Sequence, residues 1–178
     1  EIQLQQSEKM VDFKQAKHAL NERLSALNHL LNNKMYGAVE TNISYETWLL
    51  THQPFHWLAE FYEIINEHRG FDVIIGNPPY VTFTDKSISY NVKRYKTYDA
   101  KNLFALVGER CVTISHTYSS IGYIIPLSGL SIDGFAAFQK IIYGNYKSWN
   151  SFYSGDRNPS ELFTGVKIRA GIYIARYS

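Results

Sequence analysis

The sequence predicts an α/β fold in which part of a mostly parallel sheet follows an α-helical segment. Leucines recur every three or four residues in residues 1–34, which is typical of an amphipathic helix. Beyond residue 70, short apolar runs alternate with helical patterns, as in strand–helix units of a parallel sheet. Near the carboxyl end, apolar and polar residues alternate, which indicates a half-covered strand. We therefore predict a helical arm or insertion at residues 1–69 and a sheet-containing domain at residues 70–178.

The helical arm is predicted to contain two main helices. The first carries a narrow apolar stripe that suits a helical hairpin, a short coiled-coil arm or a partner site; its residues are Phe13, Ala16, Leu20, Leu24, Leu27 and Leu31. Asn32-Asn33 and Gly37 are expected to end it. Ser44 is a candidate N-cap, and Pro54 suits the first turn of a helix that reaches residue 65. Because the chain opens within a helical pattern and without Met, we expect it to be a piece of a longer protein.

The sheet domain is predicted to alternate strands and helices up to a final antiparallel hairpin. The strands are expected at residues 71–75, 120–127, 147–153 and 166–177, with helices at 102–116 and 132–143. The first two strands are short apolar runs, which favours burial in a parallel sheet. The last two strands form the hairpin.

Composition bounds the function classes. The chain has 178 residues, of which 45% are hydrophobic and 19% charged, as in globular proteins with a packed core. Its net charge of +2 is too small to identify a nucleic-acid partner without local clustering. Cys111 is the single cysteine, which excludes an internal disulfide or a cysteine-rich zinc site and favours the reducing cytoplasm. No apolar run approaches the roughly 20 residues of a membrane span, so no membrane partner is expected.

Metal ligands are not predicted. His52 and His56 lie one helical turn apart and His68 follows, but no carboxylate or cysteine completes a ligand set with them.

The first predicted strand runs directly into Gly76-Asn77-Pro78-Pro79-Tyr80, where neither a strand nor a helix can continue. The two prolines fix successive φ angles and make the loop stiff. Open α/β sheets bind ligands at the carboxyl ends of their strands. An amide, the Pro78 carbonyl and an aromatic ring in that place suit a flat heterocycle that bears an amine.

Residues 82–101 are the most basic and aromatic part of the chain. Interleaved cations and rings suit a segment that faces nucleic acid, although a solvated loop explains the pattern equally well. We expect this segment to become ordered when substrate binds. The DNA-binding candidates are Lys86, Lys93, Arg94, Lys96 and Lys101, with Arg157 in a later polar loop.

The string from Gly70 to Val81 resembles the catalytic motif of adenine-N6 DNA methyltransferases, in particular the long, type IIG-like enzymes of type II restriction–modification systems. The resemblance covers residues 54–178. It implies the carboxyl-terminal half of a Rossmann-like class I methyltransferase sheet, whose last strand is reversed. It also implies S-adenosylmethionine as the methyl donor, no metal for methyl transfer, and double-stranded DNA as the substrate.

The resemblance also implies roles for individual residues. Asn77 and Pro78 would hold the amine of a flipped adenine, and Tyr80 and Phe163 would stack on its two faces. Asn77, Asn102 and Phe104 would lie near the methyl donor. The glycine-rich turn that binds most of the donor in this family is absent, so we expect the chain alone to be inactive.

Alternatives remain open. A protein-glutamine or RNA methyltransferase uses the same Asn-Pro-Pro-Tyr chemistry, and a non-catalytic DNA-binding or assembly module would also explain the missing donor turn. Cytosine-N4 enzymes more often carry Ser at the position of Asn77, which favours adenine. Without its neighbouring strand, the edge at residues 71–75 should drive self-association, directly or with the helical arm, unless the amino-terminal helices shield it.

Overall fold

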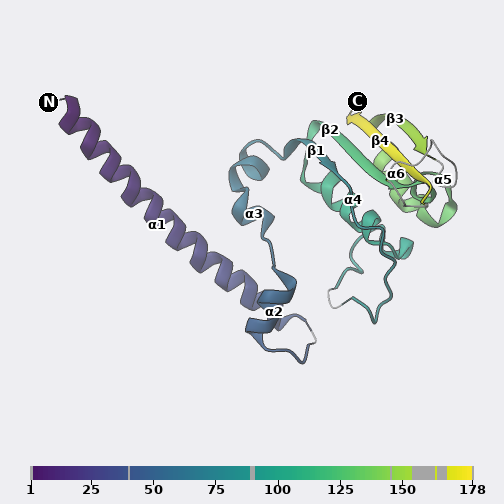
Figure 1. Cartoon of the computed structure of the whole chain (residues 1–178), viewed down its shortest axis with the longest axis horizontal. Coiled ribbons are helices and arrows are strands. Elements are labelled where there is room, and N and C mark those ends of the chain that lie inside the picture. The colour runs from purple at the N-terminus through teal and green to yellow at the C-terminus, as the bar shows by residue number, and fades with distance from the viewer. Residues whose placement is uncertain are drawn as a thin grey trace. The chain divides into compact units, whose positions relative to one another are not determined.

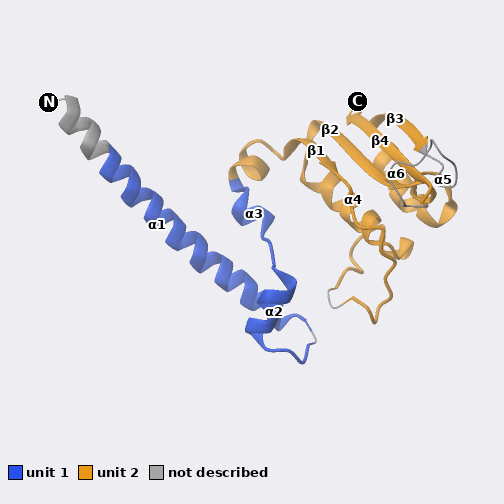
Figure 2. Cartoon of the chain, viewed as in Figure 1, with its two compact units in different colours: residues 1–62 blue, residues 63–178 orange. Residues whose placement is uncertain are grey.

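The computed structural model divides the chain into two compact units, residues 1–62 and 63–178 (Figure 2). The described residues are 2–39, 41–88, 91–144, 146–153, 163 and 168–177, with only the backbone for residues 2–9. The interpretation of residues 1–69 and 70–178 as an arm and half a catalytic domain stays a prediction. Within the described residues, no helix has the length and apolar character needed to cross a bilayer.

The first unit is built on one long helix (Figure 1). Its helices are α1 (Ile2–Gly37), α2 (Tyr45–His52) and α3 (Trp57–Glu60). The α1 helix continues through Asn32-Asn33 to Gly37. Tyr36 and Tyr45 pack around the fully buried Trp48, while Phe13 and Leu20 on the predicted stripe are exposed. As predicted, Ser44 caps α2, because its hydroxyl oxygen accepts the Thr47 N–H at 3.3 Å.

The predicted helix from Pro54 to residue 65 is confirmed only in part. Only Trp57–Glu60 is α-helical, and a π-helical turn follows at Glu63–Glu67. Phe61 ends α3 because its φ of −120° and ψ of 40° lie outside the helical region. Its ring packs on Trp57, with 5.6 Å between the ring centroids.

The second unit contains a four-stranded sheet, which confirms the α/β fold class. Its strands are β1 (Phe71–Gly76), β2 (Ser115–Pro126), β3 (Tyr146–Tyr153) and β4 (Ala170–Tyr177), in the order β1-β2-β4-β3. β1 runs parallel to β2, whereas β4 lies between β2 and β3 and is antiparallel to both. The predicted antiparallel hairpin of the last two strands is therefore confirmed, and β1 and β3 are the two edge strands of this sheet.

Three helices accompany the sheet: α4 (Leu103–Ile114), α5 (Leu127–Ser131) and α6 (Ala136–Gly144). α4 matches the predicted helix, and α6 forms most of the helix expected at 132–143. α5 was not predicted: the chain turns into it directly from Pro126, the last residue of β2.

The core lies on one face of the sheet. Along β2, Ser119, Ile121, Tyr123 and Ile125 are buried, while the residues between them are only partly so. Residues from the sheet and from α4, α5 and α6 make up the buried cluster: Phe104, Ala105, Ile121, Tyr123, Ile125, Leu130, Phe138, Ile142, Tyr146, Tyr173 and Ala175.

The opposite face of the sheet is apolar and open. One row across it pairs Ile75 with Gly122, Gly122 with Ile174, and Ile174 with Trp149. Ile75 is 80% exposed and Trp149 is 67% exposed. The expectation that β1 and β2 are buried on both faces is therefore wrong, because no described helix of the second unit covers this face.

The unpaired edge of β1 and the uncovered apolar face predict that the chain self-associates. We expect the isolated chain to self-associate with rising concentration in sedimentation velocity, because an unpaired edge and a bare apolar face favour pairing with another chain. Ile75→Lys should weaken this association at least about tenfold, since it places a charge on the edge strand β1, at an exposed position of that apolar face.

The matched control is Leu50→Lys, an equally exposed aliphatic position in α2. A wild-type chain that sediments as a monomer throughout, or equal effects of the two substitutions, would contradict the half-sheet interpretation.

Candidate active site at the end of β1

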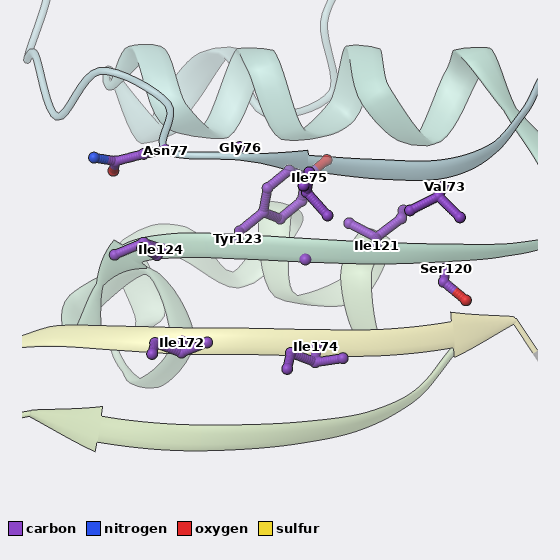
Figure 3. Close-up of a pocket in the computed structure, with 11 residues that line it drawn as sticks. Val73, Ile75, Gly76, Asn77, Ser120, Ile121, Tyr123, Ile124, Ile172 and Ile174 are labelled. Carbon is purple, nitrogen blue, oxygen red and sulfur yellow. The ribbon is translucent and has the colours of Figure 1, made fainter.

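The Asn-Pro-Pro-Tyr loop leaves the sheet at the carboxyl end of β1. Asn77 is exposed, and its amide points away from the strand (Figure 3). Pro78 is buried directly behind it. The loop thus presents one amide side chain on a backbone that is fixed by a buried proline.

Tyr80 connects Asn77 to the core. Its hydroxyl oxygen lies 2.7 Å from Asn77 Oδ1 and 2.8 Å from the carbonyl oxygen of Ile124, both within hydrogen-bond distance. Its half-buried ring meets Phe104 edge to face, with 6.5 Å between centroids. Burial raises the pKa of the Tyr80 hydroxyl above its usual value, so the group stays protonated at neutral pH.

Phe104 and Asn102, the two further residues assigned to the methyl donor, have structural partners. Phe104 is 1% exposed and stacks on Phe135 at 4.9 Å. A Cβ atom on Gly129 would lie 2.7 Å from the Phe104 ring, so only glycine allows this close approach. Asn102 caps α4, because its Oδ1 accepts the Phe104 N–H at 3.4 Å.

These contacts bear on how well the described residues fit a methyl donor. The Phe104 ring faces the core, and the Asn102 side-chain oxygen is used by the helix cap. Since these two side chains already have partners within the fold, the donor contacts expected of Asn77, Asn102 and Phe104 all stay predictions.

Segment 82–101 is closed at its base. Thr82 and Asn102 form an antiparallel bridge, and the Leu103 N–H donates to the Val81 carbonyl at 2.9 Å. The Phe83 N–H donates to the Lys101 carbonyl, also at 2.9 Å. The expectation that this segment becomes ordered only on substrate binding is wrong for its base, where backbone bonds hold both ends together.

Glu109 of α4 binds the segment by hydrogen bonds at Lys96 and Thr97. Its Oε2 accepts the N–H and the hydroxyl of Thr97, both at 2.9 Å, and its Oε1 accepts the Lys96 N–H at 3.1 Å. Thr97 is buried as a result. Glu109 was not predicted, and its only signal in the sequence is that it is the one acidic residue of α4.

Asp85, Tyr98 and Lys101 form a second closure, which we call the latch. Asp85 Oδ1 accepts the Lys101 ammonium at 2.7 Å and the Tyr98 hydroxyl at 2.5 Å. The ammonium also lies 3.5 Å from the Tyr98 ring centroid. These hydrogen bonds from Lys101 and Tyr98 lower the pKa of Asp85, and the bond to Asp85 raises the pKa of Lys101.

The predicted DNA-binding and stacking residues are variously exposed, paired within the fold or outside the described residues. Lys86, Lys93, Arg94 and Lys96 are exposed, whereas Lys101 belongs to the latch. Phe163 is partly exposed, but the residues on either side of it lie outside the described part of the chain. Arg157 also lies outside the described residues, so its DNA contact stays a prediction.

A groove of about 540 Å³ runs along the open face beside Asn77 (Figure 3). Its walls are formed by Val73 and Ile75 on one side and Ile172 and Ile174 on the other, with Gly122 between them. This lining is mostly aliphatic, with Ser120 and Asn77 as its polar side chains on the open face and at the loop.

The latch yields a prediction on pH and proteolysis. Because the latch lowers the pKa of Asp85, the ionised carboxylate stabilises the closed latch fully above the ordinary aspartate pKa of about 4. This stabilisation is lost as the pH falls further, through the lowered pKa. The raised pKa of Lys101 preserves the latch up to its ordinary pKa of about 10.4. At neutral pH, Asp85→Asn should therefore speed tryptic cleavage after Lys93, Arg94 or Lys96, as mapped by mass spectrometry.

Asp99→Asn is the control, because it makes the same charge change at an exposed carboxylate of the same segment. Equal cleavage rates in wild type and Asp85→Asn would show that the latch does not hold the segment.

Comparisons with known proteins place this geometry in a family. The chain is 32% identical over 82 residues to the type II restriction enzyme and methyltransferase RM.Eco57I of Escherichia coli, a match that covers 42% of this chain and 8% of that protein. It is 37% identical over 76 residues to a putative type II restriction enzyme and methyltransferase, RM.MjaORFECS2P, of Methanocaldococcus jannaschii, covering 43% and 6%. The matched stretch is thus less than a tenth of the length of either curated relative.

Among solved structures, a putative class I S-adenosylmethionine-dependent methyltransferase from Listeria monocytogenes matches 61% of this chain and 32% of its own, with 18% identity and a TM-score of 0.48. The model of the Eco57I restriction-modification methylase family matches residues 3–157, well over half of the sequence. This chain therefore belongs to the Eco57I restriction-modification methylase family.

Proposed function

We propose that this chain carries the target-base side of the active site of a DNA adenine-N6 methyltransferase in a restriction–modification system. The observation that supports this most is the exposed Asn77 amide in an Asn-Pro-Pro-Tyr loop at the carboxyl end of β1, in a member of a methylase family. Family membership favours DNA over a glutamine side chain or RNA as the substrate.

The chemistry needs two fixed hydrogen-bond acceptors. The exocyclic amine of adenine is a poor nucleophile, because its lone pair is delocalised into the ring. Asn77 Oδ1 and the Pro78 carbonyl would each accept one N–H of that amine and so localise and aim the lone pair. The buried Pro78 ring fixes its own carbonyl in advance, so the cost of orienting the acceptor is met by folding. S-adenosylmethionine, when bound, would supply the methyl group as an electrophilic sulfonium.

The target base must leave the duplex to reach Asn77. Flipping costs a few kcal/mol, and stacking on an aromatic ring returns roughly 1–3 kcal/mol. Tyr80, whose ring is half-buried against Phe104 beside Asn77, is the first stacking candidate. Phe163 is the second, on the basis of the family resemblance.

The DNA backbone would lie along segment 82–101. Lys86, Lys93, Arg94 and Lys96 are exposed there and carry charge that offsets phosphates. Glu109 and the latch hold the part of the segment around these residues, so less entropy is lost on binding. Lys101 is already paired, and we therefore assign it to the latch rather than to DNA.

In the complete protein encoded by the gene, Asn77→Ala should lower methyl transfer to DNA by at least about 100-fold, by analogy with removal of one fixed polar group from an active site. DNA affinity should change by less than about twofold, since Asn77 makes no phosphate contact in this proposal. Transfer is measured with radiolabelled S-adenosylmethionine, and the modified nucleoside is identified by mass spectrometry.

Asn150→Ala, at an exposed asparagine of β3, serves as the control. Full activity of Asn77→Ala would remove the mechanism. N4-methylcytosine as the product would leave the mechanism but overturn the choice of adenine.

The assignment of the exposed cations to DNA and of Lys101 to the latch predicts how each substitution changes the salt dependence of DNA affinity. In the complete protein, Lys93→Ala and Arg94→Ala should each reduce the slope of log affinity against log salt by about 1, because each removes one phosphate contact. Lys101→Met should change the slope far less, like the control Lys140→Ala on α6.

A slope change for Lys101→Met as large as that for Lys93→Ala would assign Lys101 to the DNA after all.

A further inference from the structure

The Tyr80 hydroxyl has two acceptors and one proton. Asn77 Oδ1 lies 2.7 Å and the Ile124 carbonyl oxygen 2.8 Å from the same hydroxyl oxygen. A hydroxyl donates one hydrogen bond and accepts others, and both neighbours in this arrangement are acceptors. One of the two acceptor oxygens therefore faces the Tyr80 hydroxyl oxygen with no proton between them.

Rotation of the Asn77 amide removes this conflict. The two ends of a primary amide occupy nearly the same volume, so oxygen and nitrogen exchange places without steric cost. With the nitrogen toward Tyr80, the amide donates to the tyrosine oxygen and the hydroxyl proton goes to Ile124. Both hydrogen bonds are then made, whereas the first orientation makes only one.

The rotated amide also turns Asn77 Oδ1 outward. The end of the amide that points away from the sheet in Figure 3 is then the oxygen, which faces the side from which a substrate would approach. The orientation that satisfies the internal hydrogen bonds is thus the one that presents an acceptor. The opposite orientation would present N–H groups to the N–H groups of an incoming amine.

We propose that the Tyr80 hydroxyl is a positioning group for methyl transfer: it accepts from the Asn77 amide nitrogen, donates to the Ile124 carbonyl, and so holds Oδ1 toward the target amine. This inference rests on the proposed function and deepens it. Tyr80 then has two separable parts, a ring for the base and a hydroxyl for Asn77.

The surroundings of Tyr80 make its hydroxyl a fixed reference point. The ring is held by Phe104, which is itself packed against Phe135 and Phe138 and the close backbone of Gly129. The Ile124 carbonyl belongs to β2, one residue beyond the last β1–β2 pair, Gly76 with Tyr123. Both the hydroxyl and its acceptor are therefore set by the core rather than by the loop.

The test separates the hydroxyl from the ring in the complete protein. Tyr80→Phe keeps the ring, so KM for DNA and the fluorescence of 2-aminopurine at the target position, which reports base flipping, should be unchanged. Loss of one orienting hydrogen bond should lower kcat about five- to tenfold. Tyr118→Phe, at an exposed ring on β2, is the control and should leave all three unchanged.

A double-mutant cycle with Asn77→Asp gives the sharper readout. A carboxylate accepts with both oxygens, so it has no orientation to set, and Tyr80→Phe should then cost less than about twofold. An equal loss in both backgrounds, an unchanged kcat for Tyr80→Phe, or a loss expressed in KM or base flipping would each overturn the proposal. If Asn77→Asp is too slow to assay, the split between kcat and KM for Tyr80→Phe decides alone.

The two proposals fail in different ways. A wild-type complete protein that transfers no methyl group to DNA would overturn the proposed function. If the wild-type protein methylates DNA and Tyr80→Phe leaves kcat unchanged, only the proposed role of the hydroxyl would be overturned.

Discussion

The point at which the β1–β2 ladder stops fixes the rest of the site. Parallel pairing runs up to Gly76 and Tyr123, and the two prolines then prevent β1 from continuing. The next carbonyl on β2, that of Ile124, takes its donor from Tyr80. This single hydrogen bond returns the loop to the sheet four residues after it has left. Asn77 is therefore held at the sheet edge between two fixed points.

The one-sided core explains why the site is rigid on one side and bare on the other. Aromatic residues of α4 and α6 fill the covered face, and Phe104 lies at their centre, in contact with Tyr80. Deletion of a buried phenylalanine ring costs about 3–5 kcal/mol. Loss of activity on truncating Phe104 would thus report on packing, and cannot by itself assign the residue to a methyl donor. The open face beside Asn77 contributes mainly aliphatic surface, with Ser120 as a polar exception.

Features with a local or periodic signal follow from the sequence, whereas features that depend on a distant partner do not. Ser44 is an N-cap because its hydroxyl reaches a backbone N–H three residues on, and the β3–β4 hairpin follows from alternation within each strand. The continuous helix expected from Pro54 is interrupted at Phe61, whose backbone leaves the helical region, and apolar spacing carries no signal for such a break. Lys101 looked like a DNA contact because composition cannot show that Asp85, sixteen residues earlier, faces it. The Ile124 carbonyl has no sequence signal at all, since every residue carries one.

One helix links the two halves of the proposed site. Asn102, the N-cap of α4, pairs with Thr82 just beyond the Asn-Pro-Pro-Tyr loop, Phe104 supports the ring of Tyr80, and Glu109 clamps Thr97 near the exposed cations. These three contacts come from the N-cap and the first part of α4, whose apolar face is buried in the core. Because α4 cannot shift without breaking that packing, the amide that would meet the base and the cations that would meet the phosphates share one rigid support. In the proposed complex, the core would then set the distance between the flipped base and the DNA backbone, because both contacts would be supported by the same helix.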